Sequence, residues 1–259
     1  MKIYSWNMYF NNADFDRAFD FIASSDFDIF CLQEVPTHFV ERLRALPFYI
    51  DVAVEMDQVY AGKASTRHLV ILSRYSIRHT HHISLPYREK MLKWRAYFFV
   101  RLMTLARLWG LGIGNRHSQY VDVTIEGEPV RIFNIHLPLA TTHWRAEELE
   151  TALTHRDQET ASIICGDFNI LEHPAIAPLA WFLGDSLRDA VRYKAERLRI
   201  ERHFIEHRLT NALRGKRTHA ISRSQLDHIL VSHHFNIKTA DVLADAHGSD
   251  HQPIFAEIV

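Results

Sequence analysis

Short apolar runs of strand length recur from one end of the chain to the other, and they constrain its fold more than any other feature. Each run holds three to six residues rich in Val, Ile, Leu and Phe, and polar or turn-forming residues bound it, which is typical of buried β-strands. The runs are residues 2–6, 29–32, 69–72, 120–125, 130–135, 162–165, 229–231 and 253–258. The sequence therefore predicts a protein built around extensive β-sheet.

Helical patterns lie between these runs. Residues 14–22 place Phe15, Phe19 and Ile22 on one face of a helix, and residues 144–153 repeat that spacing with Ala and Leu. No Pro-, Gly- or Ser-rich linker and no fixed-period repeat divides the sequence. Because strands with interspersed helices pack as layers, we expect one α/β (α+β) domain that spans all 259 residues.

Composition excludes several classes of protein. The chain is 47% hydrophobic and 24% charged, as an ordinary globular protein is and a disordered or coiled-coil protein is not. Its formal charge of −1 argues against a protein that coats nucleic acid by bulk charge. Two cysteines cannot form a disulfide scaffold; Cys31 and Cys165 lie in apolar runs, where we expect buried, unreactive thiols. The first seven residues hold no apolar signal-peptide core, so we expect a cytoplasmic protein.

The near-zero net charge conceals two basic segments. Residues 88–116 contain seven Lys or Arg against one acid, and residues 188–219 contain ten against four, so each segment carries a local charge of +6. Such blocks are either solvated faces or surfaces that meet an anion, and the sequence leaves both interpretations open.

Segment 88–111 combines basic with aromatic residues. On a helix, Lys90, Lys93, Tyr97 and Arg101 would share one stripe, and basic residues at this density argue against a transmembrane span. One hypothesis is a structural element of the domain. The other is a basic amphipathic element at the mouth of a cleft that contacts an anionic membrane or another polyanion, which would place the protein peripherally at the membrane.

Polar side chains stand at the ends of the apolar runs, which is where sheets commonly build functional sites. These residues are Asn7, Glu34, Asn134, His136, Asp167, Asn169, Asp227, Asp250 and His251. Hydrolysis of a phosphoester needs such groups: carboxylates to hold a hard cation and orient a water, and amide or imidazole donors for the phosphoryl oxygens. We find no His/Cys set with zinc spacing such as HExxH or CxxC, and no phosphate-binding glycine loop.

Each of these positions also has an ordinary explanation when it is taken singly. A Glu after a strand is most often a solvated turn residue, and Asp167 with Asn169 fits an Asx turn. The stretch Ser249-Asp250-His251 is a poor match to a Ser/His/Asp triad, because no nucleophile elbow is present and adjacent side chains on a strand diverge. The whole series, in order and at strand ends, points to one site.

In combination the strand ends resemble the endonuclease/exonuclease/phosphatase superfamily, the group that contains DNase I, exonuclease III-type repair nucleases, sphingomyelinases and inositol polyphosphate 5-phosphatases. The matching motifs are Trp6-Asn7, Gln33-Glu34, Ile71-Leu72-Ser73-Arg74, Asn134-Ile135-His136-Leu137, Gly166-Asp167-Phe168-Asn169, Leu226-Asp227-His228-Ile229 and Ser249-Asp250-His251. The resemblance implies a DNase I-like four-layer α/β sandwich: two mostly antiparallel sheets face to face, helices outside, and the site in a cleft at one edge.

The resemblance also implies a metal site. Glu34 corresponds to the principal Mg²⁺ ligand, with Asn7 and Asp250 nearby, and Mn²⁺ is an alternative ion. These are hard oxygen donors, which suit either cation.

The same resemblance implies the catalytic roles. Asp167 would orient or activate the attacking water, and Asn169 would hold a phosphoryl oxygen. His251 would contact the scissile phosphate while Asp227 holds its ring, and His136 would stabilise the phosphoryl group or protonate the leaving group. The substrate-binding set implied in this way is Asn7, Asn134, Asn169 and His251.

We therefore expect a monomeric, Mg²⁺-dependent phosphoester hydrolase, in the first place a phosphodiesterase. A repair-type DNA endonuclease or exonuclease, a sphingomyelinase-like phospholipid hydrolase and an inositol-phosphate phosphatase are the alternatives within this chemistry. A non-catalytic binding module is the alternative outside it, and such a protein would have lost at least one of the residues above.

Overall fold

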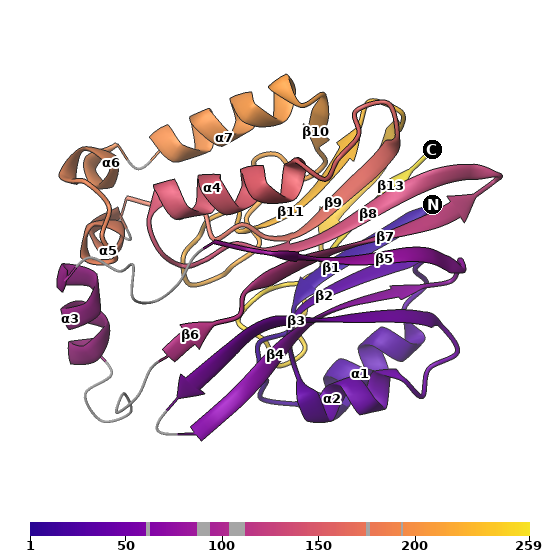
Figure 1. The fold of residues 1–259 in the computed structure, drawn as a ribbon, viewed down its shortest axis with the longest axis horizontal. Helices are drawn as coiled ribbons and strands as arrows, with labels where there is room; N and C mark the ends of the chain where they lie inside the picture. The colour runs from indigo at the N-terminus through magenta and orange to yellow at the C-terminus, as the bar shows by residue number, and fades with distance from the viewer. Residues whose placement is uncertain (61–62, 87–93, 104–111, 175–176, 193) are drawn as a thin grey trace.

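Two β-sheets pack face to face in the computed structural model, which describes residues 1–60, 63–86, 94–103, 112–174, 177–192 and 194–259 (Figure 1). The first sheet has the order β12 (Ile237–Val242), β13 (Ile254–Ile258), β1 (Lys2–Asn7), β2 (Ile29–Pro36), β4 (Lys63–Ser73), β3 (Tyr49–Tyr60) and β6 (Gly112–Gly114). The second has the order β10 (Leu209–Asn211), β11 (Asp227–Ser232), β9 (Ala161–Asp167), β8 (Glu128–His136), β7 (His117–Ile125) and β5 (Ile77–Ser84). Pairs β1–β2 and β8–β9 are parallel, and the other described pairs are antiparallel.

Helices cover the outer faces of both sheets and complete the four layers expected from the sequence. Helices α1 (Phe15–Ser24) and α2 (Thr37–Leu43) lie on the first sheet, and α4 (Thr142–Leu153) and α7 (Ala195–Glu206) lie on the second (Figure 1). Helices α3 (Trp94–Met103), α5 (Ala177–Phe182) and α6 (Leu187–Val191) gather at one end. The helical patterns at 14–22 and 144–153 correspond to α1 and α4, so both expectations are confirmed.

Local sequence sets where the two longest predicted helices begin. The Asp14 carboxylate accepts a hydrogen bond from the Arg17 amide at 3.0 Å, and the Thr141 hydroxyl accepts one from the Trp144 amide at 3.3 Å. Each cap satisfies an amide that the helix itself leaves unpaired. In α1 the buried face then carries Ala18 and Ile22, one turn apart.

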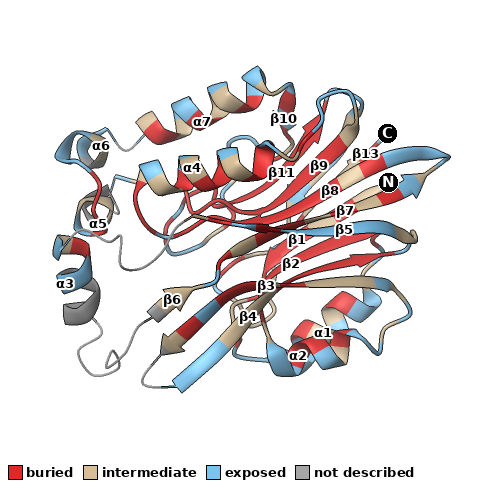
Figure 2. Ribbon diagram, viewed as in Figure 1, coloured by how far each residue is buried: buried red, intermediate tan, exposed pale blue. Residues whose placement is uncertain are grey.

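Three apolar cores hold the layers together (Figure 2). The central core lies between the sheets and contains Ile3 and Ile29 from the first and Ile132 and Ile163 from the second. Two further cores seat the helices on the outer faces. Each aliphatic side chain buried in this way contributes about 1.5–3 kcal/mol.

Both cysteines lie in the central core with free, fully buried thiols. Burial, together with a hydrogen bond to Cys165, raises the pKa of the Cys31 thiol well above its usual range. A buried thiol with a raised pKa is present as the unreactive protonated form.

A polar bridge crosses the central core between the sheets. The Asn134 amide donates to the carbonyls of Leu32 (2.9 Å) and Val70 (3.1 Å), and its oxygen accepts from Gln33 at 2.8 Å. The Asn134 side chain is fully buried and is not among the residues that line the cavity, so the structure does not place it at a substrate as we expected from the sequence. Instead it fixes one sheet against the other.

The basic segment 88–111 is described only over α3, so the expected stripe through Lys90 and Lys93 lies outside the described residues. Helix α3 is docked on α5 through the Arg95 guanidinium, which donates to two backbone carbonyls in and just after α5 (2.8 and 2.6 Å). In the part of the chain that the structure describes, no helix combines the length and apolar character needed to cross a bilayer.

Candidate active site

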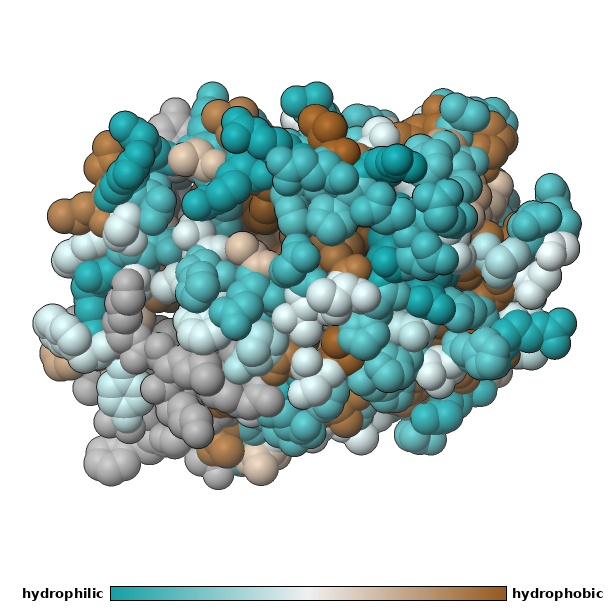
Figure 3. All heavy atoms as spheres, turned by 45° about the horizontal axis from the view of Figure 1, so that its top comes forward, coloured by the Kyte–Doolittle hydropathy of each residue, from teal (hydrophilic) through white to brown (hydrophobic). Residues whose placement is uncertain are grey.

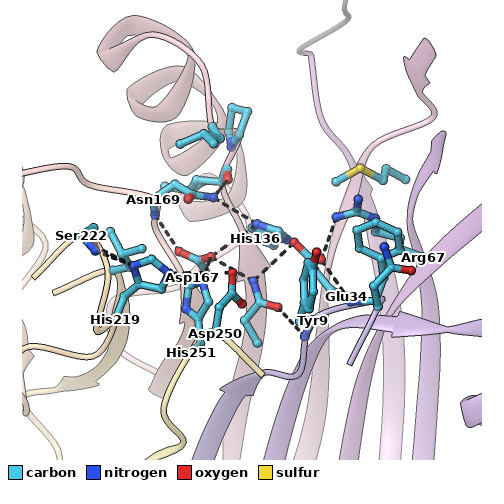
Figure 4. A pocket seen from close by; sticks show the side chains of 18 of the residues that line it. Tyr9, Glu34, Arg67, His136, Asp167, Asn169, His219, Ser222, Asp250 and His251 are labelled. Carbon is cyan, nitrogen blue, oxygen red and sulfur yellow. Dashed lines mark hydrogen bonds and ion pairs between the residues drawn. The ribbon is translucent and has the colours of Figure 1, made fainter. Parts of the chain in front are cut away.

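The polar strand ends meet around one cavity with a volume of about 510 Å³ (Figure 4). Because β1 and β2 are parallel, as are β8 and β9, their carboxyl ends bring Asn7, Glu34, His136 and Asp167 to one edge. Strand β11 runs antiparallel to β9 and pairs Asp227 with Asp167, so it begins at the same edge. The predicted residues that line the cavity are Asn7, Glu34, His136, Asp167, Asn169, Asp250 and His251.

The ring of His251 lies between two buried carboxylates. Its Nδ1 lies 2.9 Å from Oδ2 of the fully buried Asp227, and its Nε2 lies 3.7 Å from Oδ2 of Asp167. Burial alone would lower the pKa of His251, but the Asp227 and Asp167 carboxylates raise it to about 10. The ring is therefore a buried imidazolium at neutral pH, and Asp227 sets its orientation.

His136 has the same arrangement on the opposite side of Asp167. Its Nδ1 lies 2.8 Å from Oε1 of Glu55, and its Nε2 lies 3.5 Å from Oδ2 of Asp167. Burial disfavours the charged form of both His136 and Glu55, but each partner stabilises the charged form of the other. The pKa of His136 is therefore raised and the pKa of Glu55 is lowered. Two carboxylate–imidazole pairs thus flank a central carboxylate.

Glu55 is a residue that the sequence analysis missed. It lies inside β3, at a shift in the β3–β4 register between Val54 and Met56, and its side chain is fully buried. Its second oxygen accepts a hydrogen bond from the Glu34 amide at 2.7 Å. No local signal marks it, because its partner His136 lies 81 positions along the chain.

Asp167 is positioned by backbone geometry on both sides. Gly166 before it has φ of 145°, and a Cβ there would lie 1.7 Å from the Ile135 carbonyl oxygen, so only glycine fits. The Asp167 carboxylate accepts hydrogen bonds from the Asn169 amide (2.8 Å) and from the Asn7 side chain (3.1 Å). Burial raises the pKa of Asp167, and the two flanking imidazoles counteract that rise.

Asn169 itself occupies the left-handed region, with φ of 51°. Its side-chain amide donates to the Leu137 carbonyl at 2.8 Å and lies 3.1 Å from Nε2 of His136. The structure therefore places Asn169 against His136 at the cavity wall, where the resemblance implied a phosphoryl contact.

Glu34 enters the cavity from a bulge in β2. The β2–β4 register shifts between Leu32 and Val35, and Glu34 has φ of 57°, a left-handed conformation that is uncommon for a residue with a Cβ. Its carboxylate forms an ion pair with Nη1 of Arg67 at 2.8 Å and lies 3.5 Å from the Asn7 amide. Arg67 on β4 lines the cavity and is a second residue that the sequence analysis did not identify.

Asp250 lies at the outer part of the site, with its side chain 40% exposed. Its Oδ2 is 3.8 Å from Nε2 of His219, whose Nδ1 accepts a hydrogen bond from the Ser222 amide at 3.0 Å. Burial opposes ionisation of Asp250, but His219 and His251 lower the pKa of its carboxyl. His219 closes the basic segment 188–219 and was not singled out in the sequence.

The donors in this cavity fit a hard divalent cation. Asn7, Glu34 and Asp250 line the cavity and offer carboxylate and carboxamide oxygens, which Mg²⁺ and Mn²⁺ prefer. The ligand atoms of Asp250, His219 and His251 also lie within 4.8 Å of one another. The Arg67 guanidinium beside Glu34 holds that carboxylate in place.

Comparison with known proteins agrees with this geometry. A model of the endonuclease/exonuclease/phosphatase family matches residues 4–251. The chain belongs to this family. It is therefore a member of a superfamily of metal-dependent phosphoester hydrolases. A comparison with curated proteins gave no match.

Solved structures of the family share the fold. A family member from Beutenbergia cavernae is 18% identical to this chain and superposes with a TM-score of 0.68, covering 100% of this chain and 71% of its own. A family member from Leptotrichia buccalis is 14% identical and has the same TM-score, with 100% of this chain and 99% of its own covered. A mannosyl-6-phosphatase from Bacteroides thetaiotaomicron is 18% identical and has a TM-score of 0.63, with 100% of this chain and 99% of its own covered. Because these sequence identities are low, the structural similarity establishes the four-layer fold alone.

Proposed function

We propose that this protein is a Mg²⁺-dependent phosphodiesterase that hydrolyses its substrate by attack of water on phosphorus. The observation that carries the proposal is the row of five buried groups in which Asp167 lies between His136 and His251, each ring held from behind by a carboxylate. Such a row places one carboxylate base between two oriented imidazole rings, groups that suit phosphoryl transfer to water.

The two histidine rings contact the phosphoryl oxygens. His251 is charged at neutral pH because Asp227 and Asp167 raise its pKa, and Glu55 favours the charged form of His136 in the same way. Fixed cations in a desolvated site stabilise the charge that grows on the oxygens in the transition state without having to reorganise.

Asp167 orients the attacking water. Its carboxylate lines the cavity and is fixed by the Asn169 amide and the Asn7 side chain (Figure 4). Burial raises the pKa of Asp167, which strengthens it as a proton acceptor from that water.

Asn7, Glu34 and Asp250 would hold the metal ion. A divalent cation bound there supplies charge neutralisation at a phosphoryl oxygen. The Arg67 guanidinium and the Phe10 amide (3.3 Å) keep the Glu34 carboxylate oriented toward the cavity.

The cavity rim favours a substrate with an organic group on each side of the phosphate. Tyr9 and Phe10 line one part of the cavity, and the exposed side chains of Leu139 and Ile221 line others. Apolar and aromatic surface around a polar floor suits the two ester groups of a diester. Among the solved relatives, a 3′ phosphatase from Neisseria was crystallised with a product DNA hairpin (18% identical, TM-score 0.56), so DNA belongs in the substrate panel.

The test is a panel assay with Mg²⁺ or Mn²⁺. It covers bis-p-nitrophenyl phosphate, p-nitrophenyl phosphate, plain and abasic DNA, RNA, sphingomyelin, phosphatidylglycerol and inositol phosphates. We expect cleavage of at least one diester, and loss of that activity by at least about 100-fold in EDTA and in Glu34→Gln. Glu41→Gln, an exposed glutamate on α2, is the matched control and should retain full activity. Full activity in EDTA would refute metal dependence, and turnover of monoesters alone would refute the diesterase assignment.

A further inference from the structure

A second cluster of imidazole and carboxylate groups lies on the helical layer outside the second sheet, among residues that do not line the catalytic cavity. It consists of Glu150 near the end of α4, His203 in the last turn of α7, and His207, which caps α7. One ligand atom from each lies within 4.8 Å of the others.

The spacing of the two histidines brings their rings together. Residues four apart share one face of a helix, and the ring centroids of His203 and His207 lie 4.4 Å apart. The segment reads His203-Phe204-Ile205-Glu206-His207, the reverse of the HExxH order sought in the sequence and equally a pattern of zinc-binding helices. This spacing lies outside the two motifs, HExxH and CxxC, that were sought in the sequence.

The distances are those of a site that closes around one ion. Oε2 of Glu150 lies 3.1 Å from Nε2 of His203 and 3.9 Å from Nε2 of His207. In a tetrahedral site with bonds of about 2.0–2.1 Å, neighbouring ligand atoms lie about 3.3–3.4 Å apart, so small rotations of these side chains suffice.

A neighbouring carboxylate is also placed as it is at metal-binding histidines. Nδ1 of His203 faces Oε2 of Glu206 at 3.8 Å. A carboxylate at one ring nitrogen leaves the other nitrogen for the ion.

The cluster is open to solvent. The side chains of His203, His207 and Glu150 are 28%, 22% and 53% exposed. Figure 3 brings this layer forward and shows a largely hydrophilic surface over it, so a hydrated ion can reach the site without a change in fold.

We propose that Glu150, His203 and His207 form a binding site for a transition-metal dication of the Zn²⁺ class, with water completing its coordination. Two imidazoles and one carboxylate select Zn²⁺, Ni²⁺ or Cu²⁺ over Mg²⁺, so this site and the catalytic cavity take different ions. The ion joins α4 to α7 at their carboxyl ends. At their amino ends, the buried ion pair between Arg145 and Glu196 (2.6 Å) already joins them.

The first test is a calorimetric titration of the whole protein with Zn²⁺ in excess Mg²⁺. The wild type should bind one Zn²⁺ that His203→Ala and His207→Ala bind at least about 10–100-fold more weakly, since even losing a supporting residue costs that much. His143→Ala is the control, because that histidine is exposed on α4 and pairs with Glu147 instead. Equal Zn²⁺ affinity in wild type and both variants, or weakened binding in His143→Ala, would overturn the proposal.

The second test reads the coordination geometry with Co²⁺ as the probe. Four-coordinate Co²⁺ with nitrogen ligands should give strong visible absorption bands, which Co²⁺ in an oxygen-lined octahedral site gives only weakly. Glu150→Gln should change these bands, because glutamine has the size of glutamate but lacks its charge. Far-ultraviolet circular dichroism checks that the variant keeps its helices. Absence of the strong bands in the wild type, or identical bands in Glu150→Gln, would overturn the assignment.

Discussion

Replacement of Asp227 by Asn should destabilise the protein by an amount that depends on pH. The Asp227 carboxylate is fully buried and lies 2.9 Å from the ring of His251, whose pKa rises from 6.5 to about 10. A rise of that size means that the folded protein holds the proton about 5 kcal/mol more tightly than the unfolded chain does. Because Asp167 also contributes, loss of Asp227 alone should cost about 3–5 kcal/mol, the usual result of removing one partner of a buried pair.

The direction of the pH dependence follows from the sign of this shift. The folded-state pKa of His251 lies above its unfolded value, so the stabilisation is complete below pH 6.5 and is lost as pH rises toward 10. The difference in unfolding free energy between wild type and Asp227→Asn should therefore be largest near pH 6 and narrow steadily at higher pH.

Urea unfolding at several pH values in EDTA measures this difference without a contribution from bound metal. Asp20→Asn, an exposed substitution on α1 with the same change of charge, is the control and should match the wild type. Nuclear magnetic resonance titration of the His251 ring gives its pKa directly. A stability difference that is equal at pH 6 and pH 10, or a wild-type His251 that titrates near 6.5, would refute the reasoning.

Three further expectations follow from the site and the core. Asp167→Asn should lower kcat by about 10²–10³ with little change in melting temperature, and a loss below tenfold would mean that Asp167 does not orient the water. Glu55→Gln should lower the pKa of His136 and reduce the free energy of unfolding most between pH 4.5 and 6.5. In that window the ionised Glu55 and the protonated His136 both stabilise the fold, because the stabilisation by Glu55 is present above pH 4.5 and that by His136 below pH 6.5. An unchanged His136 titration would contradict the pairing. Cys31 and Cys165 should resist Ellman's reagent in the folded protein and react in urea, and rapid reaction of the native protein would contradict their burial.

Sequence reasoning reached the sheet architecture and most of the cavity because both leave local marks. Apolar runs define strands, and polar residues at their ends mark the edge where Asp167 and His251 meet. Glu55 left no such mark, since it lies mid-strand and its role depends on a strand register. Because side chains alternate between the two faces of a strand, Asn134 and His136 lie on the same face of β8. This pattern does not show how far each side chain lies from the cavity. Asn134 is two residues further from the end of the strand and is fully buried between the sheets.

The bridge at Asn134 links the geometry of the site to a contact outside the cavity. Apolar contacts between two sheets have no preferred direction, so on their own they define the relative position of the sheets poorly. The Asn134 carboxamide forms three hydrogen bonds with the other sheet, and their geometry is satisfied in only one relative position. Each sheet carries half of the site, with Glu34 on one and Asp167 on the other. The alignment of these halves is therefore set deep in the sandwich by Gln33 and Asn134, two side chains that do not line the cavity.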